Sequence, residues 1–191
     1  MKRVVLLIAL ACFALAPAYA ETISGVTLGC FGTACVPAPA AATGGLGFQT
    51  GAFTAVPNSD GSVTGIGAIA GNNLGYFLLS SANVNYNGDF TLTVAFTAPP
   101  GTTPGTGTYN ATFKGHVTTV GNGLFIDFNN AYQFFTSPAG NFAFSVNDVS
   151  LTAGTGVPVA ITGNVYSTPE PASMVFMALG LGGFGVFRRR K

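Results

Sequence analysis

Hydrophobic and polar residues alternate along the middle of the chain. The clearest example is residues 90–97, where Phe90, Leu92, Val94 and Phe96 are separated by threonine and alanine. A period of two places alternate side chains on opposite faces of a β-strand, so this segment predicts a strand with one apolar face. The same pattern predicts strands at residues 109–114, 124–128, 142–147 and 157–161, and less regular apolar runs predict strands at 24–29, 46–55, 62–70 and 74–80.

Turn-forming residues separate the predicted strands. Asn87-Gly88 predicts a tight turn, and a change of phase predicts a bulge or turn near Asn147-Asp148. The segments 37–45 and 98–107 are rich in Pro and Gly and predict a linker or long loops. No helical period appears within residues 21–168. Roughly eight to ten short strands indicate an all-β domain, and we expect an antiparallel β-sandwich of jelly-roll or immunoglobulin-like connectivity.

The first 20 residues follow a different pattern. Lys2-Arg3 precedes a long apolar stretch, and Ala18 and Ala20 place small residues just before Glu21. This arrangement predicts a helical secretory signal peptide that directs the chain to the Sec export machinery and is removed by signal peptidase before Glu21. A lipoprotein signal centred on Cys12 is an alternative, although the apolar run continues beyond that cysteine.

The C-terminal residues 169–191 form a second unusual pattern. Pro169-Glu170-Pro171 is a stiff, extended element, residues 172–187 carry no charge, and Arg188-Arg189-Arg190-Lys191 closes the chain. As a helix, the uncharged stretch would be about 24 Å long, against roughly 30 Å for the hydrocarbon core of a bilayer. We therefore expect a hydrophobic helix that is a marginal anchor, with its basic tail on the cytoplasmic side of the membrane.

These C-terminal features together resemble the PEP-CTERM sorting signal of Gram-negative bacteria. The matching residues are Pro169-Glu170-Pro171, Leu179-Gly180-Leu181-Gly182-Gly183 and the terminal arginine cluster. The resemblance implies processing near the Pro-Glu-Pro motif by an exosortase, an integral-membrane transpeptidase-like protease. It also implies a transient stay in the inner membrane and delivery to the cell surface, outer envelope or extracellular matrix, often beside exopolysaccharide. It says nothing about the domain formed by residues 21–168.

Charge is scarce in this sequence. Only 7% of the residues are Asp, Glu, Lys or Arg, whereas about 25% is usual for soluble domains. Within residues 21–168 the single cation is Lys114, and the acids are Glu21, Asp60, Asp89, Asp127 and Asp148. Nucleic-acid binding depends on clustered Lys and Arg, so this composition excludes a basic nucleic-acid-binding domain.

Two cysteines remain once the predicted signal peptide is removed. Cys30 and Cys35 are close in sequence and lie in a chain expected to be exported, so they predict a disulfide. A redox pair is less consistent with their spacing, because they do not form a Cys-x-x-Cys motif. No histidine lies near them. We therefore predict no metal site and no cofactor.

Residues able to support catalysis or ion binding are few. His116, the only histidine, could act as a base with a serine and an aspartate, but it shares a strand face with Lys114 and has the pattern of a surface residue. Asp127 and Asp148 could serve as a glycosidase pair only if folding brings them together. Residues 83–88 imitate the start of a calcium-binding loop, but Val94 stands where such a loop needs a bidentate glutamate.

The sequence favours a non-catalytic protein of the cell envelope or matrix, with a structural or adhesive role. An extracellular carbohydrate-binding module associated with exopolysaccharide is the alternative, and a hydrolase centred on His116 is less favoured. Trp, a common sugar platform, is absent. The available aromatic candidates for a glycan site are Tyr76, Tyr86, Tyr109, Tyr132 and Tyr166.

Overall fold

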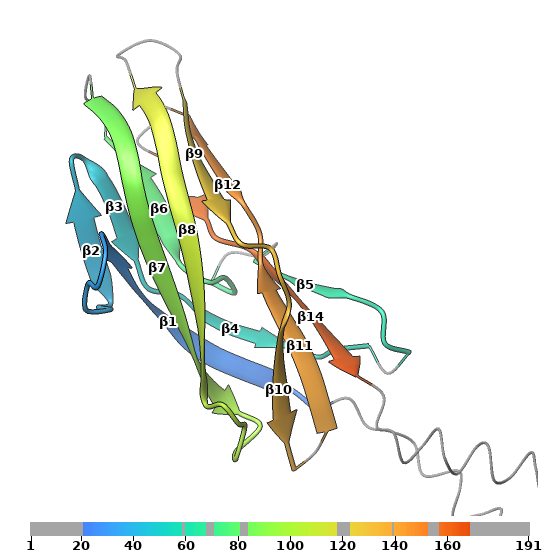
Figure 1. The fold of residues 1–191 in the computed structure, drawn as a ribbon. Coiled ribbons are helices and arrows are strands. Elements are labelled where there is room, and N and C mark those ends of the chain that lie inside the picture. Colours follow the sequence, from blue (N-terminus) through green and yellow to red (C-terminus); the bar gives the residue numbers. More distant parts are fainter. Residues whose placement is uncertain are drawn as a thin grey trace, which may run out of the picture.

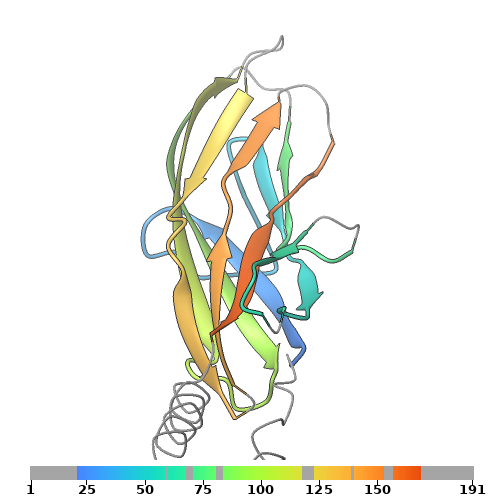
Figure 2. The same ribbon diagram turned by 90° about the vertical axis from the view of Figure 1, so that its right-hand side faces the viewer.

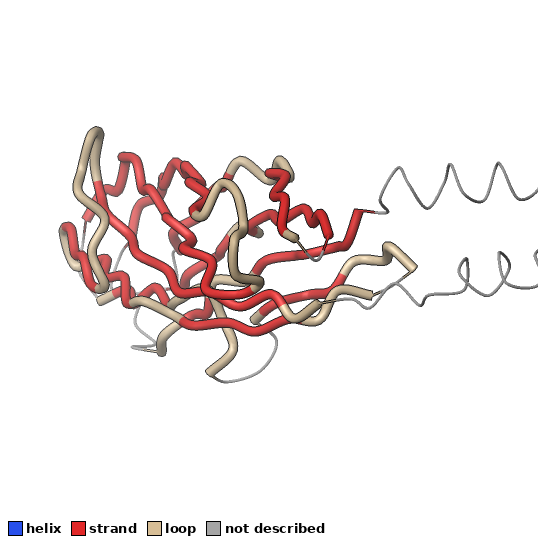
Figure 3. Tube along the Cα trace, turned by 90° about the horizontal axis from the view of Figure 1, so that it is seen from below, coloured by secondary structure: helices blue, strands red, loops and turns tan. Residues whose placement is uncertain are grey.

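The computed structural model describes residues 21–58, 60–67, 71–80, 84–117, 123–138, 140–152 and 157–168. Regular structure within these residues is β-strand throughout (Figure 3). The expected flanking helices lie outside the described residues. The strands are β1 (Ile23–Phe31), β2 (Ala40–Thr43), β3 (Leu46–Gln49), β4 (Ala52–Ala55), β5 (Thr64–Ile66), β6 (Tyr76–Leu79), β7 (Val84–Ala98), β8 (Thr106–Val117), β9 (Gly123–Phe128), β10 (Gln133–Ser137), β11 (Gly140–Val146), β12 (Val149–Thr152), β13 (Val159–Ala160) and β14 (Gly163–Thr168).

The strands form three antiparallel sheets (Figure 1). The largest sheet has the order β12-β9-β8-β7-β1-β4. Two four-stranded sheets have the orders β10-β11-β14-β5 and β13-β6-β3-β2. The long strands β7 and β8 pair from Val84 opposite Val117 to Ala95 opposite Thr106. These pairings confirm the expected all-β class and the antiparallel arrangement.

Phenylalanine rings fill the space between the sheets. Phe90 of the six-stranded sheet contacts Phe48 and Phe77 of one four-stranded sheet, with ring centroids 5.3 and 4.9 Å apart. Phe96, on the same face of β7, contacts Phe135 of the other four-stranded sheet at 4.5 Å. Burial of each such ring contributes about 1.5–3 kcal/mol. Both smaller sheets therefore pack against one face of the six-stranded sheet, and Figure 2 shows β5 and β14 on the opposite side from β7.

At three places a connection of only two residues carries the chain from one sheet into another: between β3 and β4, between β11 and β12, and between β13 and β14. At the first crossing the Gly51 N–H donates to Thr27 Oγ1 at 3.0 Å. A Cβ at position 51 would lie 2.2 Å from the backbone nitrogen of Gly75, so a side chain does not fit there. At the second crossing Asp148 Oδ1 accepts a hydrogen bond from the Phe128 N–H at 2.8 Å. These crossings fold the chain around one core.

Several expected strands are confirmed, although their ends shift. The runs 90–97 and 109–114 lie within the longer β7 and β8, and the expected break near Asn147-Asp148 separates β11 from β12. The expected strand 46–55 is divided into β3 and β4 by the crossing at Thr50-Gly51. A jelly-roll or immunoglobulin-like connectivity stays a prediction.

Two predictions about connections are wrong. Asn87-Gly88 does not form a turn, because both residues lie inside β7 and Gly88 is opposite Phe113. A Cβ on Gly88 would come within 2.8 Å of the Phe113 ring, so the glycine makes room for an aromatic side chain instead of bending the chain. The segment 37–45 is not wholly a loop, because Ala40–Thr43 forms β2 and the positive φ angles of Gly44 and Gly45 close a hairpin to β3.

The sequence pattern also gave no sign of β10. Its residues 133–137 are short and place two phenylalanines side by side, so no alternation is visible. Phe135 is buried and Phe134 is 67% exposed. Only pairing with β11 establishes this segment as a strand.

Candidate functional site

The outer face of the six-stranded sheet carries a group of polar side chains. Asp89 on β7 lies opposite Thr112 on β8, and Thr112 lies opposite Asp127 on β9. One step along the strands, Thr91 lies opposite Asn110. Since residues two apart in a strand share a face, these side chains all point away from the phenylalanine core. We call this group, together with Asn129 after β9, the polar patch.

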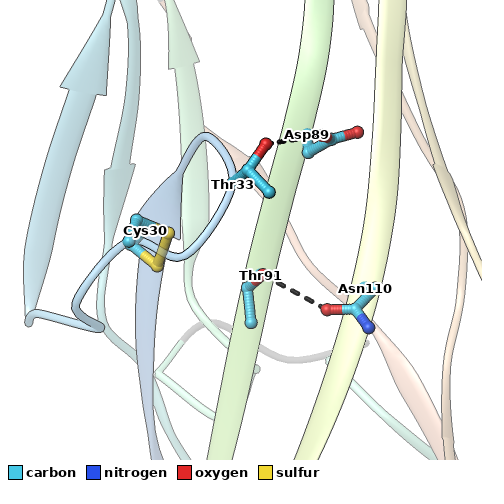
Figure 4. Close-up of a disulfide and its surroundings, with 6 residues drawn as sticks. Cys30, Thr33, Asp89, Thr91 and Asn110 are labelled. Carbon is cyan, nitrogen blue, oxygen red and sulfur yellow. Dashed lines mark hydrogen bonds between the residues drawn. A yellow bond between two sulfur atoms is a disulfide. The ribbon is translucent and has the colours of Figure 1, made fainter.

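The disulfide loop borders the polar patch (Figure 4). Cys30 and Cys35 form a disulfide with their Cα atoms 5.8 Å apart. The Gly32 N–H donates to the backbone oxygen of Asp89 at 2.8 Å, and Thr33 Oγ1 donates to the Asp89 carboxylate at 3.5 Å. The loop is therefore attached to β7 at its tip as well as closed at its base.

Loop and sheet together enclose a shallow hollow of about 490 Å³. No lysine, arginine or histidine is among the lining residues, which are Gly32, Thr33, Ala34, Asp89, Phe90, Thr91, Asn110, Ala111, Thr112, Asp127, Phe128 and Asn129. Thr91 Oγ1 donates to Asn110 Oδ1 at 3.2 Å, which links the two polar side chains across β7 and β8. The hollow thus offers hydroxyl and amide groups and two carboxylates, and no cation.

His116 lies apart from this hollow. It is exposed on β8, where its Nδ1 forms a hydrogen bond with Asn85 Oδ1 across the strand pair. A catalytic histidine of the Ser-His-Asp type is oriented by a carboxylate, whereas the partner here is an amide. The geometry therefore supports the interpretation of His116 as a surface residue.

Asp127 and Asp148 have different surroundings in the fold. Asp127 belongs to the polar patch, while both carboxylate oxygens of Asp148 are engaged, by the Phe128 N–H and by the Asn130 side chain at 3.2 Å. Asp60 lies in an exposed turn, where the backbone N–H of Ser62 lowers the pKa of its carboxyl. The acid that shares the polar patch with Asp127 is Asp89. The sequence did not indicate this pair, because only the register of three strands places the two residues on one face.

Residues 84–88, the described part of the segment that resembles the start of a calcium loop, are extended. Asn85 and Asn87 lie in β7 and alternate with the buried Tyr86. No group of three or more His, Cys, Asp or Glu residues suited to a metal occurs among the described residues.

Two of the five candidate tyrosines are buried and therefore cannot present a ring to a glycan. Tyr86 and Tyr109 are buried, and their hydroxyls donate to the backbone oxygens of Gly44 and Phe144. Burial raises the pKa of both phenols. Tyr132 and Tyr166 contact each other edge to face. The exposed aromatic residue nearest to the polar patch along the chain is Phe125, which is 46% exposed and precedes Asp127 by two residues on β9.

The predicted processing residues lie mostly outside the described residues. This applies to Ala18 and Ala20 and to the sorting residues Pro169, Glu170, Pro171, Arg188, Arg189, Arg190 and Lys191. Glu21 is the first described residue. At the other end, β14 stops at Thr168, which is paired with Asn141 immediately before the Pro-Glu-Pro sequence.

Residues 167–191 match the family model of the PEP-CTERM protein-sorting motif. The chain carries a PEP-CTERM sorting signal. A PEP-CTERM signal implies processing by an exosortase and export through the membrane to the cell surface. No curated protein and no solved structure matches the chain significantly. The described residues contain no helix that is long and apolar enough to cross a membrane.

Proposed function

We propose that this protein is made as a precursor and acts, after export, as a non-catalytic structural or adhesive component of the cell envelope or extracellular matrix. The observation that carries this proposal is the PEP-CTERM signal, whose Pro-Glu-Pro motif directly follows Thr168, the last paired residue of the β-domain. Cleavage near Pro169 would release the domain with all the described residues of its hydrophobic core.

We propose that export begins with the signal peptide, residues 1–20. The Sec machinery would carry the chain across the inner membrane, and signal peptidase would cut before Glu21. The Cys30–Cys35 disulfide supports this route, because disulfides persist in oxidising compartments outside the cytoplasm. The exosortase would then act on residues 169–171 while residues 172–187 stay in the membrane.

The test is the intact mass of the protein recovered from the envelope and the medium of a host that has an exosortase, and of the same host without it. We expect a chain that begins at Glu21 and ends near Pro169–Pro171 only where the exosortase is present. A variant with Glu170→Ala tests the motif, and Asp60→Asn, which removes an acid from an exposed turn, serves as its control. A product that retains Arg188 to Lys191 in the exosortase host would overturn the proposed processing.

Carbohydrate binding is the second candidate function, favoured by the polar patch and its hollow. The hydrolase alternative has less support, because His116 is paired with an amide and lies apart from the hollow. Polysaccharide-degrading activity that disappears in His116→Ala would contradict the non-catalytic proposal.

A further inference from the structure

The polar patch has an arrangement of charge that selects among carbohydrates. Asp89 and Asp127 are on the first and third of three neighbouring strands, with Thr112 between them. Because neighbouring strands are about 4.8 Å apart, the Cα atoms of the two aspartates are about 10 Å apart across the sheet. Carboxylates carried at this backbone spacing suit a ligand that presents two positive groups along its length.

The surroundings of the two carboxylates suit a hydroxyl-rich ligand. Between and beside them lie the hydroxyls of Thr91 and Thr112 and the amide of Asn110, and the disulfide loop forms a wall on one side. Such groups donate and accept hydrogen bonds with sugar hydroxyls. The loop is held by the Gly32 and Thr33 hydrogen bonds to Asp89, so the wall is in place before a ligand arrives.

The acidic character also excludes one class of glycan. No cation lines the hollow, and a uronic-acid polymer would bring further negative charge toward Asp89 and Asp127. The one nearby cation, Lys114, borders the patch on β8, two residues after Thr112 and opposite Phe125. Phe125 adds an exposed apolar ring at this end, suited to the apolar face of a sugar.

From this geometry we infer that the polar patch binds a polysaccharide that carries free amino groups, such as a partly or fully deacetylated amino-sugar polymer. The ammonium groups lie against Asp89 and Asp127, and the sugar hydroxyls contact Thr91, Asn110 and Thr112. The inference deepens the carbohydrate-binding candidate and rests on the proposed export, which would bring the domain to a polysaccharide.

The experiment measures binding of a soluble glucosamine oligomer to the full chain in detergent, by calorimetry and by amide chemical shifts. We expect shifts centred on Asn110 and Thr112, and binding that weakens as salt is added. Asp89→Asn and Asp127→Asn should each weaken binding about tenfold, because each removes one charge-assisted contact. Lys114→Gln should strengthen binding, since it removes a like charge near the ligand.

Matched controls separate this site from a general charge effect. Asp60→Asn changes the net charge of the chain equally at an exposed turn away from the lining residues, and we expect it to leave affinity unchanged. An N-acetylated oligomer of the same length should bind more weakly, and alginate should not bind. The inference is overturned if oligolysine with the same number of amino groups binds equally well, or if Asp89→Asn and Asp127→Asn bind as the wild type does.

The measurement does not depend on export. A chain that binds the oligomer but is not processed by an exosortase would overturn the proposed sorting route and leave the binding site standing. A chain that is processed by the exosortase but does not bind the oligomer would overturn the proposed binding site and leave the sorting route standing.

Discussion

Individual residues decide how closely the strands and rings approach one another. Gly88 lies within β7 because any side chain would meet the Phe113 ring, and Gly51 lies at a crossing because any side chain would meet backbone atoms. Buried polar side chains also have hydrogen-bond partners. Thr27, fully buried on β1, donates to the Leu74 carbonyl at 3.0 Å and accepts from the Gly51 N–H. The fit between sheets therefore depends on small residues and paired polar groups as well as on phenylalanines.

Replacing Gly88 by alanine should destabilise the domain. The new Cβ would lie 2.8 Å from the Phe113 ring, which has to move within a packed core. We expect the free energy of unfolding to fall by about 1–3 kcal/mol, measured by urea denaturation. Gly65→Ala on β5 is the control, because a Cβ there meets nothing within 4 Å and should cost little or stabilise slightly. Equal effects of the two substitutions would contradict this account of Gly88.

Replacing Tyr109 by phenylalanine should show how much one buried hydrogen bond contributes to the free energy of unfolding. The Tyr109 hydroxyl donates to the Phe144 carbonyl at 3.1 Å, and its loss leaves that carbonyl without this donor. We expect the free energy of unfolding at neutral pH to fall by about 1–2 kcal/mol.

The same substitution should change the response to alkaline pH. Burial raises the pKa of Tyr109, so above about pH 10 the phenol ionises in the unfolded chain while the folded chain keeps its proton. The stability of the wild type should therefore fall as the pH rises above 10. Since Tyr109→Phe lacks this contribution, its deficit should narrow there. A difference that stays constant with pH would contradict burial as the cause.

At the level of strands and loops, hydrogen bonds from other segments satisfy part of the backbone of two edge strands. The side chain of Asn72 covers the edge strand β4, accepting from the Thr54 N–H at 2.8 Å and donating to the Thr54 carbonyl at 3.0 Å. The edge strand β10 forms a bridge between Thr136 and Thr103. Charged side chains, especially lysines, often prevent edge strands from pairing with other chains. This chain has few charges, and the hydrogen bonds to β4 and β10 serve the same purpose here.

Reduction of the disulfide should weaken the domain by a predictable amount. Cys30 and Cys35 close a short loop, for which the loop-closure model gives about 2 kcal/mol of stabilisation. We expect the urea midpoint to shift to lower concentration in the presence of a reductant, with no change in sequence or packing volume. An unchanged midpoint would show that the hydrogen bonds of Gly32 and Thr33 alone hold the loop.

Strands with regular alternation could be predicted from the sequence, because the period of two is a property of each strand alone. β7 and β8 belong to this class. β2 and β10 do not, since an Ala-rich segment and a Gln-Phe-Phe-Thr-Ser segment acquire their strand conformation from pairing with a neighbour. The candidate site was predictable only in part. The alternation within each strand indicates which polar residues point outward, but it does not indicate that residues of different strands lie together.

For the whole molecule, the described domain holds its own core. Every described residue of the main hydrophobic cluster lies between Ile23 and Val165, and the PEP-CTERM motif begins at the end of β14. We therefore expect the domain to fold without the sorting signal, as a protein released by cleavage would need to do.

A fragment of residues 21–168 should consequently fold and unfold cooperatively, with the circular dichroism of an all-β protein. A fragment of residues 21–152 is the control. It lacks β14, whose partners are β11 and β5, and it also lacks the buried Ile161 and Val165, so we expect it to remain unfolded. Failure of the longer fragment to fold would show that residues 169–191 contribute to the domain.

The sequence by itself determined the all-β class, the regular strands and the C-terminal sorting signal, because each depends on residues that are neighbours along the chain. The order of strands in the sheets, the crossings between sheets and the polar patch were decided only by the tertiary structure. Asp89 and Asp127 illustrate the reason: they are far apart in sequence and share one face only because β8 pairs with β7 on one side and β9 on the other. Pairings of this kind depend on the fit of the whole core, which no local pattern records.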